Sequence, residues 1–387
     1  MKILSITSGY PDKEYRVKKI FAHEQNKEFQ KQGCEINVIN LGATTNITEN
    51  FEGIDVLKVK KSGNNLLKIF KNIQLIKKHL KSKKFDLVLF NGLAANQYFY
   101  LKYFKSITRK TAIIVHGTDG MLEKSWLKNY LKRRFLKKVD YIFPVSHYTD
   151  TLVAHLEKRT DKSAKKSKVV YNGINPSKFS DVLNISKEEL KKEFGIKKET
   201  FVILTVCDLI ERKGIDILIK AVAHFSKKNK DFLHIIIGKG DKKASLIEQA
   251  KQLNIIENIK FIDYIEKDEE LVKYYKLADV YSMLSKTTYN KPATEGFGIS
   301  YIEASYLGVP VIGGNNGGTT TAVQHNFTGF LVDPYSEQSY KDVSNYLNLL
   351  KNNREEYNRL SKNGIFMVEK EFTWKKNVEK ILKLIKS

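Results

Sequence analysis

The sequence contains little cysteine and no long apolar run. These two features exclude disulfide-rich proteins, thiolate zinc proteins and proteins with membrane-spanning helices. Its 387 residues include only two cysteines, Cys34 and Cys207, too few for a disulfide framework or a thiolate zinc site. No apolar run approaches the roughly 18 residues that a membrane span requires. Residues 1–7 hold one lysine in a very short apolar stretch, which predicts a strand rather than a signal peptide. We therefore expect a reducing, cytoplasmic setting.

Several functional motifs are also missing. The sequence has no P-loop, no H-E-x-x-H pair and no cluster with metal-ligand spacing. Residues 238–241 (GKGD) follow an expected strand, but the third glycine of a dinucleotide fingerprint would fall on Lys243. An NAD-dependent oxidoreductase is therefore poorly supported.

The composition is that of a globular protein. Hydrophobic residues make up 42% of the chain and charged residues 28%, which supports a sizeable core and excludes disorder as the main state. At roughly 150 residues per domain, the length predicts two or three domains.

The net charge of +24 is unevenly distributed. Residues 1–190 contain 36 Lys and Arg against 18 Asp and Glu, whereas the remainder contains 31 against 25. This asymmetry indicates that the first half meets something anionic: a membrane surface, a polyanionic acceptor or nucleic acid. The alternative is a compositional bias toward Lys, Asn and Ile.

Strand-like and helix-like segments alternate almost throughout, which predicts parallel sheets covered by helices. We expect two Rossmann-like domains joined near residues 176–190. The expected strands are 1–7, 36–41, 86–90, 112–116, 141–146 and 169–174, then 201–206, 234–238, 260–264, 280–284 and 309–313. Ligands of such sheets bind beyond the carboxyl ends of the strands, so the expected site is the cleft between the domains.

The strongest motif is residues 294–304 (TEGFGISYIEA). Glu295 and Glu303 are eight positions apart, and a helix is expected from Ile299 to Leu307. The N–H groups at a helix N-terminus can hold an anion, and Gly296 and Gly298 would let the backbone approach it closely. The two carboxylates could accept hydrogen bonds from sugar hydroxyls. The alternative is an ordinary loop–helix junction.

Two further motifs also follow expected strands. Arg212 and Lys213 precede Gly214 in residues 207–221, where a βα loop could meet a leaving diphosphate. Gly317 and Gly318 in residues 308–323 could offer backbone donors to a ligand. The alternatives are a solvated basic turn for the first motif and a turn with positive φ for the second.

Together these motifs resemble the donor-binding half of the retaining glycosyltransferases of family 4, which have the GT-B fold. The resemblance covers essentially the whole chain. Further matching blocks are 116–120, 144–149, 169–179, 261–265, 278–285 and 326–334. The implied α/β fold has two Rossmann-like domains facing across a cleft: 1–180 for the acceptor and 181–370 for the nucleotide sugar. Residues 371–387 are similar to the closing helix that returns to the first domain.

The resemblance also implies site residues. The catalytic residues would be Glu295 at the donor sugar, His116 near the reacting centre, and Lys213 and Arg212 at the diphosphate. Donor-binding residues would be Glu303 at the ribose, with Gly296, Phe297, Gly298, Ile299, Gly317, Gly318 and Ile265. Gly9, Tyr10 and Asp119 would lie on the acceptor side, and no metal or cofactor is implied. Without the family context, a lone histidine at a strand end is as often a packed or hydrogen-bonded residue.

The chain departs from the family pattern at three places. Cys207-Asp208-Leu209 stands where Gly-Arg-Leu is common, and an Asp beside a diphosphate is electrostatically unfavourable. Either Asp208 points away and Arg212 supplies the second cation, or the pocket is weaker. Thr321 replaces a common acidic residue, and residues 9–21 replace the usual Gly-Gly loop.

The expected function is therefore a cytoplasmic, metal-independent, retaining transferase. It would move a sugar from a UDP- or GDP-linked donor to a hydroxyl of a glycan or glycolipid precursor. The alternatives are a basic nucleic-acid-binding protein and a sugar-nucleotide epimerase or glycan phosphorylase of the same fold.

Residues 126–143 combine six basic residues with Trp126, Tyr130 and Phe135. Such a segment could lie on the inner face of an anionic membrane, which predicts peripheral contact through the N-terminal domain. The alternative is a lysine-rich helix packed by its apolar stripe.

Overall fold

A computed structural model describes residues 1–12, 20–63, 65–158, 166–265, 267–290 and 292–386. The chain separates into two units. Unit 1 comprises Met1–Asn172 and Trp374–Ser387, and unit 2 comprises Gly173–Thr373. The chain thus crosses between units at Asn172 and Thr373, whereas the sequence placed the boundaries at 180 and 370.

Unit 1 is built on a sheet of seven strands in the described residues, in the order β3-β4-β2-β1-β5-β6-β7. All neighbours are parallel except β3 and β4, which are antiparallel. The strands are β1 (Lys2–Thr7), β2 (Glu35–Ala43), β3 (Ile47–Phe51), β4 (Ile54–Lys60), β5 (Phe85–Asn91), β6 (Thr108–Val115) and β7 (Tyr141–Pro144). Central β1 is buried on both faces after its first residue, as expected where helices cover both sides.

The expected strand at 169–174 is wrong. The N–H groups of Lys168 and Val170 bond to carbonyls of β7, but the segment then leaves the sheet because the chain crosses to unit 2 after Asn172.

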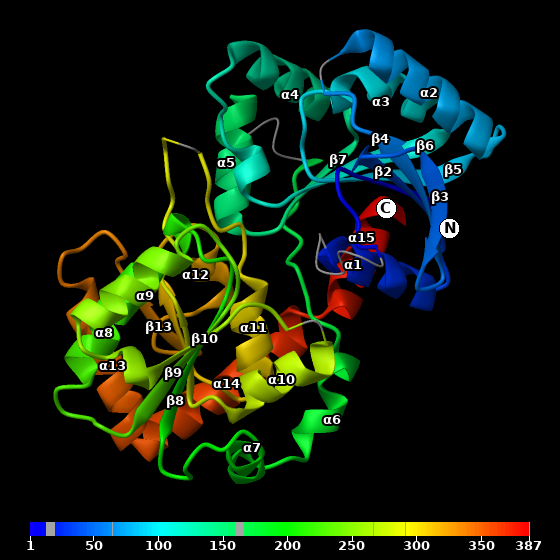
Figure 1. The fold of residues 1–387 in the computed structure, drawn as a ribbon. Helices are drawn as coiled ribbons and strands as arrows, with labels where there is room; N and C mark the ends of the chain where they lie inside the picture. The colour runs from blue at the N-terminus through cyan, green and yellow to red at the C-terminus, as the bar shows by residue number, and fades with distance from the viewer. Residues whose placement is uncertain (13–19, 64, 159–165, 266, 291, 387) are drawn as a thin grey trace. The chain divides into compact units, whose positions relative to one another are not determined.

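Helices cover the two faces of the unit 1 sheet in separate groups (Figure 1). One face carries α2 (Leu66–Leu80), α3 (Gln97–Ser106) and α4 (Trp126–Lys138), whereas α1 (Ile20–Lys31) and α15 (Trp374–Lys386) pack together on the other. The shorter η1 (Thr118–Gly120) and α5 (His147–Glu157) complete the unit. Helix α2 forms because its apolar positions recur at helical spacing and the Asn65 side chain accepts from the N–H of Lys68 at its start.

Unit 2 has a fully parallel sheet, with the order β10-β9-β8-β11-β12-β13 in the described residues. Its strands are β8 (Phe201–Val206), β9 (Phe232–Ile237), β10 (Ile259–Ile262), β11 (Val280–Met283), β12 (Val311–Gly314) and β13 (Gly329–Val332). Its longer helices are α7 (Lys187–Glu193), α8 (Ile215–Phe225), α9 (Lys243–Gln252), α10 (Asp268–Leu277), α11 (Ile299–Tyr306), α13 (Ser339–Asn352) and α14 (Arg354–Glu371). Short turns are η3 (Pro176–Phe179), α6 (Ser180–Leu183), η4 (Glu211–Lys213), η5 (Ile256–Asn258) and α12 (Thr319–Ala322). The predicted α/β fold with two Rossmann-like domains is confirmed.

The order of strands in unit 2 reverses beside β8. The chain runs from β8 outward to β9 and β10, then returns to β11 on the other side of β8. Loops that leave the carboxyl ends of β8 and β11 therefore diverge and open a crevice, the usual ligand position in such sheets. Two of the sequence motifs, 207–213 and 294–298, lie in these two loops.

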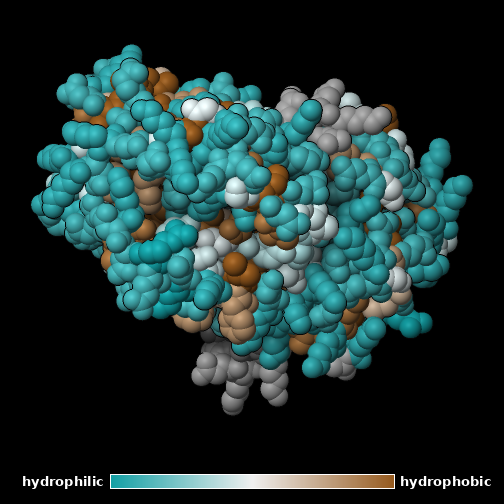
Figure 2. All heavy atoms as spheres, turned by 90° about the horizontal axis from the view of Figure 1, so that it is seen from below, coloured by the Kyte–Doolittle hydropathy of each residue, from teal (hydrophilic) through white to brown (hydrophobic). Residues whose placement is uncertain are grey.

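Polar residues cover most of the face seen in Figure 2, and hydrophobic residues appear there only in small groups. Within the described ranges, no helix is both long and apolar enough to pass through a membrane.

Candidate functional site

The two loops at the reversal point of unit 2 are tied together by backbone contacts. The N–H of Lys286 donates to the carbonyl of Arg212 at 2.8 Å. Gly214, at φ 62°, lies so close to the second loop that a Cβ atom would come 2.2 Å from the Leu284 carbonyl oxygen. Only glycine fits this position, so the sequence Arg212-Lys213-Gly214 is held against the loop after β11.

Three of the predicted catalytic residues meet at this point. The Oε2 atom of Glu295 lies 2.9 Å from Nη1 of Arg212 and 2.6 Å from Nζ of Lys213, and Ser285 also donates to it at 3.3 Å. Burial raises the pKa of Glu295, but the two cations outweigh burial and lower it to about 2. Glu295 therefore stays ionised and acts only as a hydrogen-bond acceptor.

Asp208 lies in the loop that follows β8. Its side chain is exposed, and its carbonyl accepts from the N–H of Ile210 at 2.9 Å. The second cation beside Lys213 is Arg212.

Glu303 lies on α11 in a separate polar cluster. Its Oε2 accepts from the Tyr275 hydroxyl at 3.0 Å, and its Oε1 lies 3.3 Å from Nζ of Lys178. Lys178 also pairs with Asp268 at 3.1 Å. Burial lowers the pKa of Lys178, but the two carboxylates outweigh it and raise the pKa above its ordinary value. No role was expected for Lys178 or Tyr275 from the sequence, because no regular spacing links either residue to Glu303.

Glycines let the loops of unit 2 approach each other. Gly298, at φ 96°, precedes α11, and a Cβ there would come 2.6 Å from the Tyr301 ring. The N–H of Gly318 donates to the Glu295 carbonyl at 2.7 Å, so this donor is used within the unit. Gly317 has φ 60°, which agrees with the alternative interpretation of a turn with positive φ.

The other residues predicted on the donor side include two buried side chains and the first residue of α11. Phe297 is buried, and its ring packs on Phe372 at 5.2 Å between centroids. Ile265 is buried just beyond β10, and Ile299 begins α11. A buried Phe297 side chain leaves only its backbone to face a ligand.

We expect Gly318→Ala to lower the free energy of unfolding by about 3 kcal/mol through overpacking. A Cβ at this position would come 1.9 Å from the Gly296 carbonyl oxygen, although its own φ of −74° is ordinary. Urea unfolding monitored by circular dichroism measures the change. In the control, Gly195→Ala, the new Cβ meets no atom within 4 Å, and only the strain of φ 67° is added. Equal losses of unfolding free energy in both variants would contradict the close packing of the loop after β12 against the loop after β11.

In unit 1, His116 follows β6 and is held by neighbouring loops. Its Nε2 lies 2.9 Å from Oδ1 of Asn91, and its ring packs 4.6 Å from that of Phe21. The carboxylate of Asp119 accepts from the N–H groups of His116 at 2.9 Å and Leu93 at 2.8 Å. Asp119, expected on the acceptor side, thus joins the loops that follow β5 and β6.

A chain of buried amides connects His116 with the C-terminal helix. Asn91 donates to Gln25 at 3.4 Å, and Gln25 donates to Asn377 of α15 at 2.7 Å. Asn377 in turn donates to the Tyr171 carbonyl at 2.6 Å. A carbonyl can only accept, so every amide in the chain is oriented and Oδ1 of Asn91 faces the histidine. His116 therefore carries its proton on Nε2 when neutral.

We expect Asn377→Ala to lower the free energy of unfolding by about 1–3 kcal/mol, because it removes the partners of Gln25 and the Tyr171 carbonyl. Gln25 is 2% exposed, so water does not readily replace the lost bond. Urea unfolding measures the loss, and ring ¹⁵N shifts of His116 measure its tautomer. Lys375→Ala, at an exposed position of the same helix, is the control. An unchanged free energy of unfolding and unchanged ¹⁵N shifts would contradict the hydrogen bonds that we assign to these buried amides.

Tyr10, expected on the acceptor side, is 1% exposed. Its hydroxyl contacts Nδ1 of His23 at 2.9 Å and accepts from Asn26 at 3.3 Å, so its side chain belongs to the interior of unit 1. Burial raises the pKa of Tyr10 and lowers that of His23. Gly9 is also buried, and its carbonyl accepts from the Thr7 hydroxyl. The rest of the expected loop, residues 13–19, lies outside the described residues.

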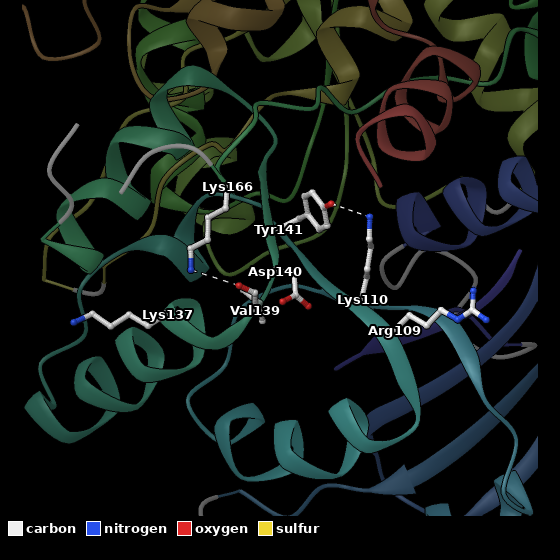
Figure 3. Close-up of a pocket in the computed structure, with 7 residues that line it drawn as sticks. All are labelled: Arg109, Lys110, Lys137, Val139, Asp140, Tyr141 and Lys166. Atoms are coloured by element: carbon white, nitrogen blue, oxygen red, sulfur yellow. Dashed lines mark hydrogen bonds between the residues drawn. The ribbon is translucent and has the colours of Figure 1, made fainter. Parts of the chain in front are cut away.

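An open hollow of about 640 Å³ lies at the opposite, amino-terminal edge of the unit 1 sheet (Figure 3). Four of its lining residues are cations. Lys110 bonds to the Tyr141 hydroxyl and the Ile385 carbonyl, and Lys166 bonds to the carbonyls of Leu136 and Val139. Arg109 and Lys137 point outward to either side. The hollow is therefore distant from the strand ends that carry His116. Three of its cations already have partners, since Nη1 of Arg109 also lies 3.9 Å from Oδ1 of Asp86.

No group of three or more His, Cys, Asp or Glu in the described residues is arranged to hold a metal ion. Both cysteines are free.

The fold and site define a two-unit α/β protein of the GT-B type, with a charged cluster at the reversal point of the second sheet. Two family models agree with it along most of the chain: "Glycosyltransferase Family 4" matches residues 20–178, and "Glycosyl transferases group 1" matches residues 186–367. The chain belongs to the family-4 type of GT-B glycosyltransferases.

Curated relatives match over part of their length. A GDP-mannose-dependent alpha-(1-6)-phosphatidylinositol monomannoside mannosyltransferase of Mycobacterium tuberculosis is 33% identical over 158 residues, 41% of this chain and 40% of the relative. The O-antigen biosynthesis glycosyltransferase WclY of Escherichia coli is 33% identical over 153 residues, 40% of this chain and 38% of the relative. The matched regions thus span about 40% of these relatives.

Solved structures match the whole chain at low identity. A glycosyltransferase from Rickettsia africae has a TM-score of 0.79 and 19% identity, covering 100% of this chain and 97% of that one. HepE of Anabaena in complex with UDP has a TM-score of 0.75 and 19% identity, covering 100% of both chains. At this identity the likeness establishes the fold.

Proposed function

We propose that the chain is a retaining glycosyltransferase that moves a sugar from a nucleotide-diphosphate donor to a hydroxyl of a glycan or glycolipid precursor in cell-surface polysaccharide synthesis. The observation that carries the proposal is the cluster of Arg212, Lys213 and Glu295 at the reversal point of unit 2. Two cations there match the charge of a diphosphate, and an ionised carboxylate matches sugar hydroxyls.

The departing diphosphate gains negative charge as the glycosidic bond breaks. Arg212 and Lys213 would stabilise that charge, since both already lie in a partly buried site where electrostatic interactions are stronger than in water. The same two cations would supply the positive charge that other transferases obtain from a metal. Glu295 would accept hydrogen bonds from the donor sugar, and Glu303 from the ribose.

Unit 1 would supply the acceptor side of the reaction. His116 at the end of β6 is oriented by Asn91, and its Nε2–H is directed by the amide chain. We propose that attack occurs on the face from which the diphosphate leaves, as the family resemblance implies. This geometry keeps the anomeric configuration and needs no protein nucleophile.

The donor is proposed as UDP- or GDP-linked because some similar proteins are named with a guanine nucleotide and others with a uracil nucleotide. The mycobacterial relative is named as GDP-mannose-dependent, whereas HepE was solved with UDP and with UDP-glucose. The family match does not favour a nucleic-acid-binding protein or an epimerase.

A calorimetric panel of UDP- and GDP-sugars, followed by turnover with lipid-linked and glycan acceptors, tests the proposal. We expect one base to bind preferentially, and turnover to persist in EDTA with the anomeric configuration retained by NMR. Absence of binding across the panel would contradict the donor assignment. An inverted product would contradict the retaining mechanism, and loss of turnover in EDTA the metal independence.

A further inference from the structure

Helices α2, α3 and α4 form a surface of unusual charge. They lie side by side on one face of the unit 1 sheet, and together they contain twelve Lys and Arg residues and no Asp or Glu (Figure 1). We call the outward side of these three helices the cationic face. Its exposed cations are Lys68, Lys71, Lys77, Lys78, Lys102, Lys105, Arg134, Lys137 and Lys138.

Few acids offset this charge. Glu123, just before α4, pairs with Lys128 at 2.9 Å and with buried Lys132 at 2.8 Å. Asp140, just after α4, lies 3.6 Å from Lys105. The remaining exposed cations of the cationic face thus produce a strongly positive potential over one side of unit 1.

The same face exposes large apolar side chains at two helix starts. In the first turns of α2, the exposed fractions are 59% for Leu66, 77% for Leu67 and 60% for Phe70. In α4 they are 76% for Trp126, 47% for Leu127 and 47% for Tyr130. Groups of exposed apolar residues on a folded protein mark contact surfaces, and aromatic residues among lysines are typical of a membrane interface.

Both apolar turns lie at one edge of the sheet. Helix α2 follows β4 and α4 follows β6, and both strands run parallel to β1, so each helix starts at the carboxyl edge. The loops before α2 and α3 are joined there by the bond from Asn96 to the Gly63 carbonyl at 3.1 Å. His116 lies at this edge too, at the end of β6.

We propose that the cationic face docks unit 1 on an anionic lipid surface. The first turns of α2 and α4 enter the interface, and the lysines around them contact lipid phosphates. A second copy of this chain is disfavoured as the occupant, because two acid-free faces repel each other. The proposal goes beyond the proposed function, and its test uses no sugar nucleotide. Its failure would leave that function untouched.

Sedimentation of the full chain with vesicles tests the docking. We expect binding to phosphatidylcholine vesicles containing phosphatidylglycerol to be about tenfold stronger than to phosphatidylcholine alone at about 0.1 M salt. Binding should fall sharply toward about 1 M salt, where the screening length shortens to about 3 Å. Equal binding to both vesicles, or no binding to either, would overturn the proposal.

Matched charge variants locate the surface. The variant K71E/K78E/K102E changes three exposed lysines of the cationic face, and K220E/K228E/K251E changes three exposed lysines of unit 2 by the same net charge. We expect the first to lose about tenfold or more in vesicle affinity and the second to bind nearly as the parent does. Similar losses in both would mean that net charge alone causes binding, and would overturn the assignment to α2–α4.

Apolar variants distinguish a membrane from another polyanion. L67N/F70N/W126N removes apolar contacts from the cationic face, whereas L183N/F366N/Y289N removes exposed apolar groups of unit 2. We expect only the first to weaken vesicle binding. If it binds vesicles normally, or if a single-stranded oligonucleotide binds more tightly than anionic vesicles do, the face recognises polyanions in general and the proposal is wrong.

Tryptophan fluorescence gives a readout at the surface itself. The chain has two tryptophans, Trp126 at 76% exposure and Trp374 at 4%. We expect a blue shift on adding anionic vesicles, and quenching by brominated lipid, because Trp126 leaves water. W126F should show neither change. An unshifted spectrum with bound vesicles would contradict insertion of the α4 turn.

Discussion

Lys213→Ala is expected to lower kcat on the order of 10²-fold, the usual consequence of losing one charge-stabilising donor. Nζ of Lys213 lies 2.6 Å from Oε2 of Glu295, which the guanidinium of Arg212 also contacts, and we propose that the diphosphate leaves beside these two cations. The effect should fall mainly on kcat, since the charge on the leaving group is greatest in the transition state. Steady-state kinetics with the donor identified by calorimetry measures it.

Lys220→Ala, an exposed lysine on α8, is the control for a general change in charge and should turn over normally. Because Lys213 is only 9% exposed, circular dichroism should accompany the kinetics to confirm folding. Near-parental turnover of a folded Lys213→Ala variant would remove this residue from the mechanism.

Glu295→Gln is expected to reduce transfer on the order of 10²-fold while leaving nucleotide affinity within a few-fold. The amide keeps the shape of the side chain but loses the charge that two cations and the sugar hydroxyls would share. In contrast, Glu303→Gln should weaken nucleotide binding about tenfold, because a hydrogen bond to a charged acceptor contributes about 1.5–3 kcal/mol. Calorimetry with the free nucleoside diphosphate separates the two effects.

The low pKa of Glu295 also predicts an acid-dependent loss of stability. Its folded pKa is lowered to about 2, so its ion pairs stabilise the fold above the unfolded pKa of about 4.3. That contribution, about 3 kcal/mol, is lost as the pH falls toward 2. The stability difference between the parent and Glu295→Gln should therefore be full at pH 7 and shrink below about pH 4. A pH-independent difference would contradict the ion-pair assignment.

The positions of the strands along the sequence were largely predictable, because buried parallel strands are short apolar runs. Residues 201–206 and 234–238 were expected as strands and form β8 and β9. Residues 169–174 were wrongly predicted as a strand because they begin with a short apolar run, as buried strands do. Only the start of this segment bonds to β7. The short strand β3 has a mostly exposed pattern, which carries no periodic signal.

The predicted cluster of Arg212, Lys213 and Glu295 rests on local motifs, and the structure brings the three together. Lys178 and Tyr275 could not be predicted beside Glu303, because a lysine and a tyrosine without regular spacing look like any surface or core residue. The burial of Tyr10, in the loop after β1, was also unpredictable, since it depends on His23 and Asn26 of helix α1.

The sequence by itself determined the α/β class, the division into two Rossmann-like halves and the loops that carry the charged motifs. These are properties of local periodicity and of residues close together in the chain. Only the tertiary structure decided which residues and helices that are distant in the sequence contact one another. It joined Gln25 to Asn377, 352 positions away, and gathered the acid-free helices α2, α3 and α4 on one face. Sequence spacing carries no information on such contacts, because the order of strands in the sheet determines which distant side chains become neighbours.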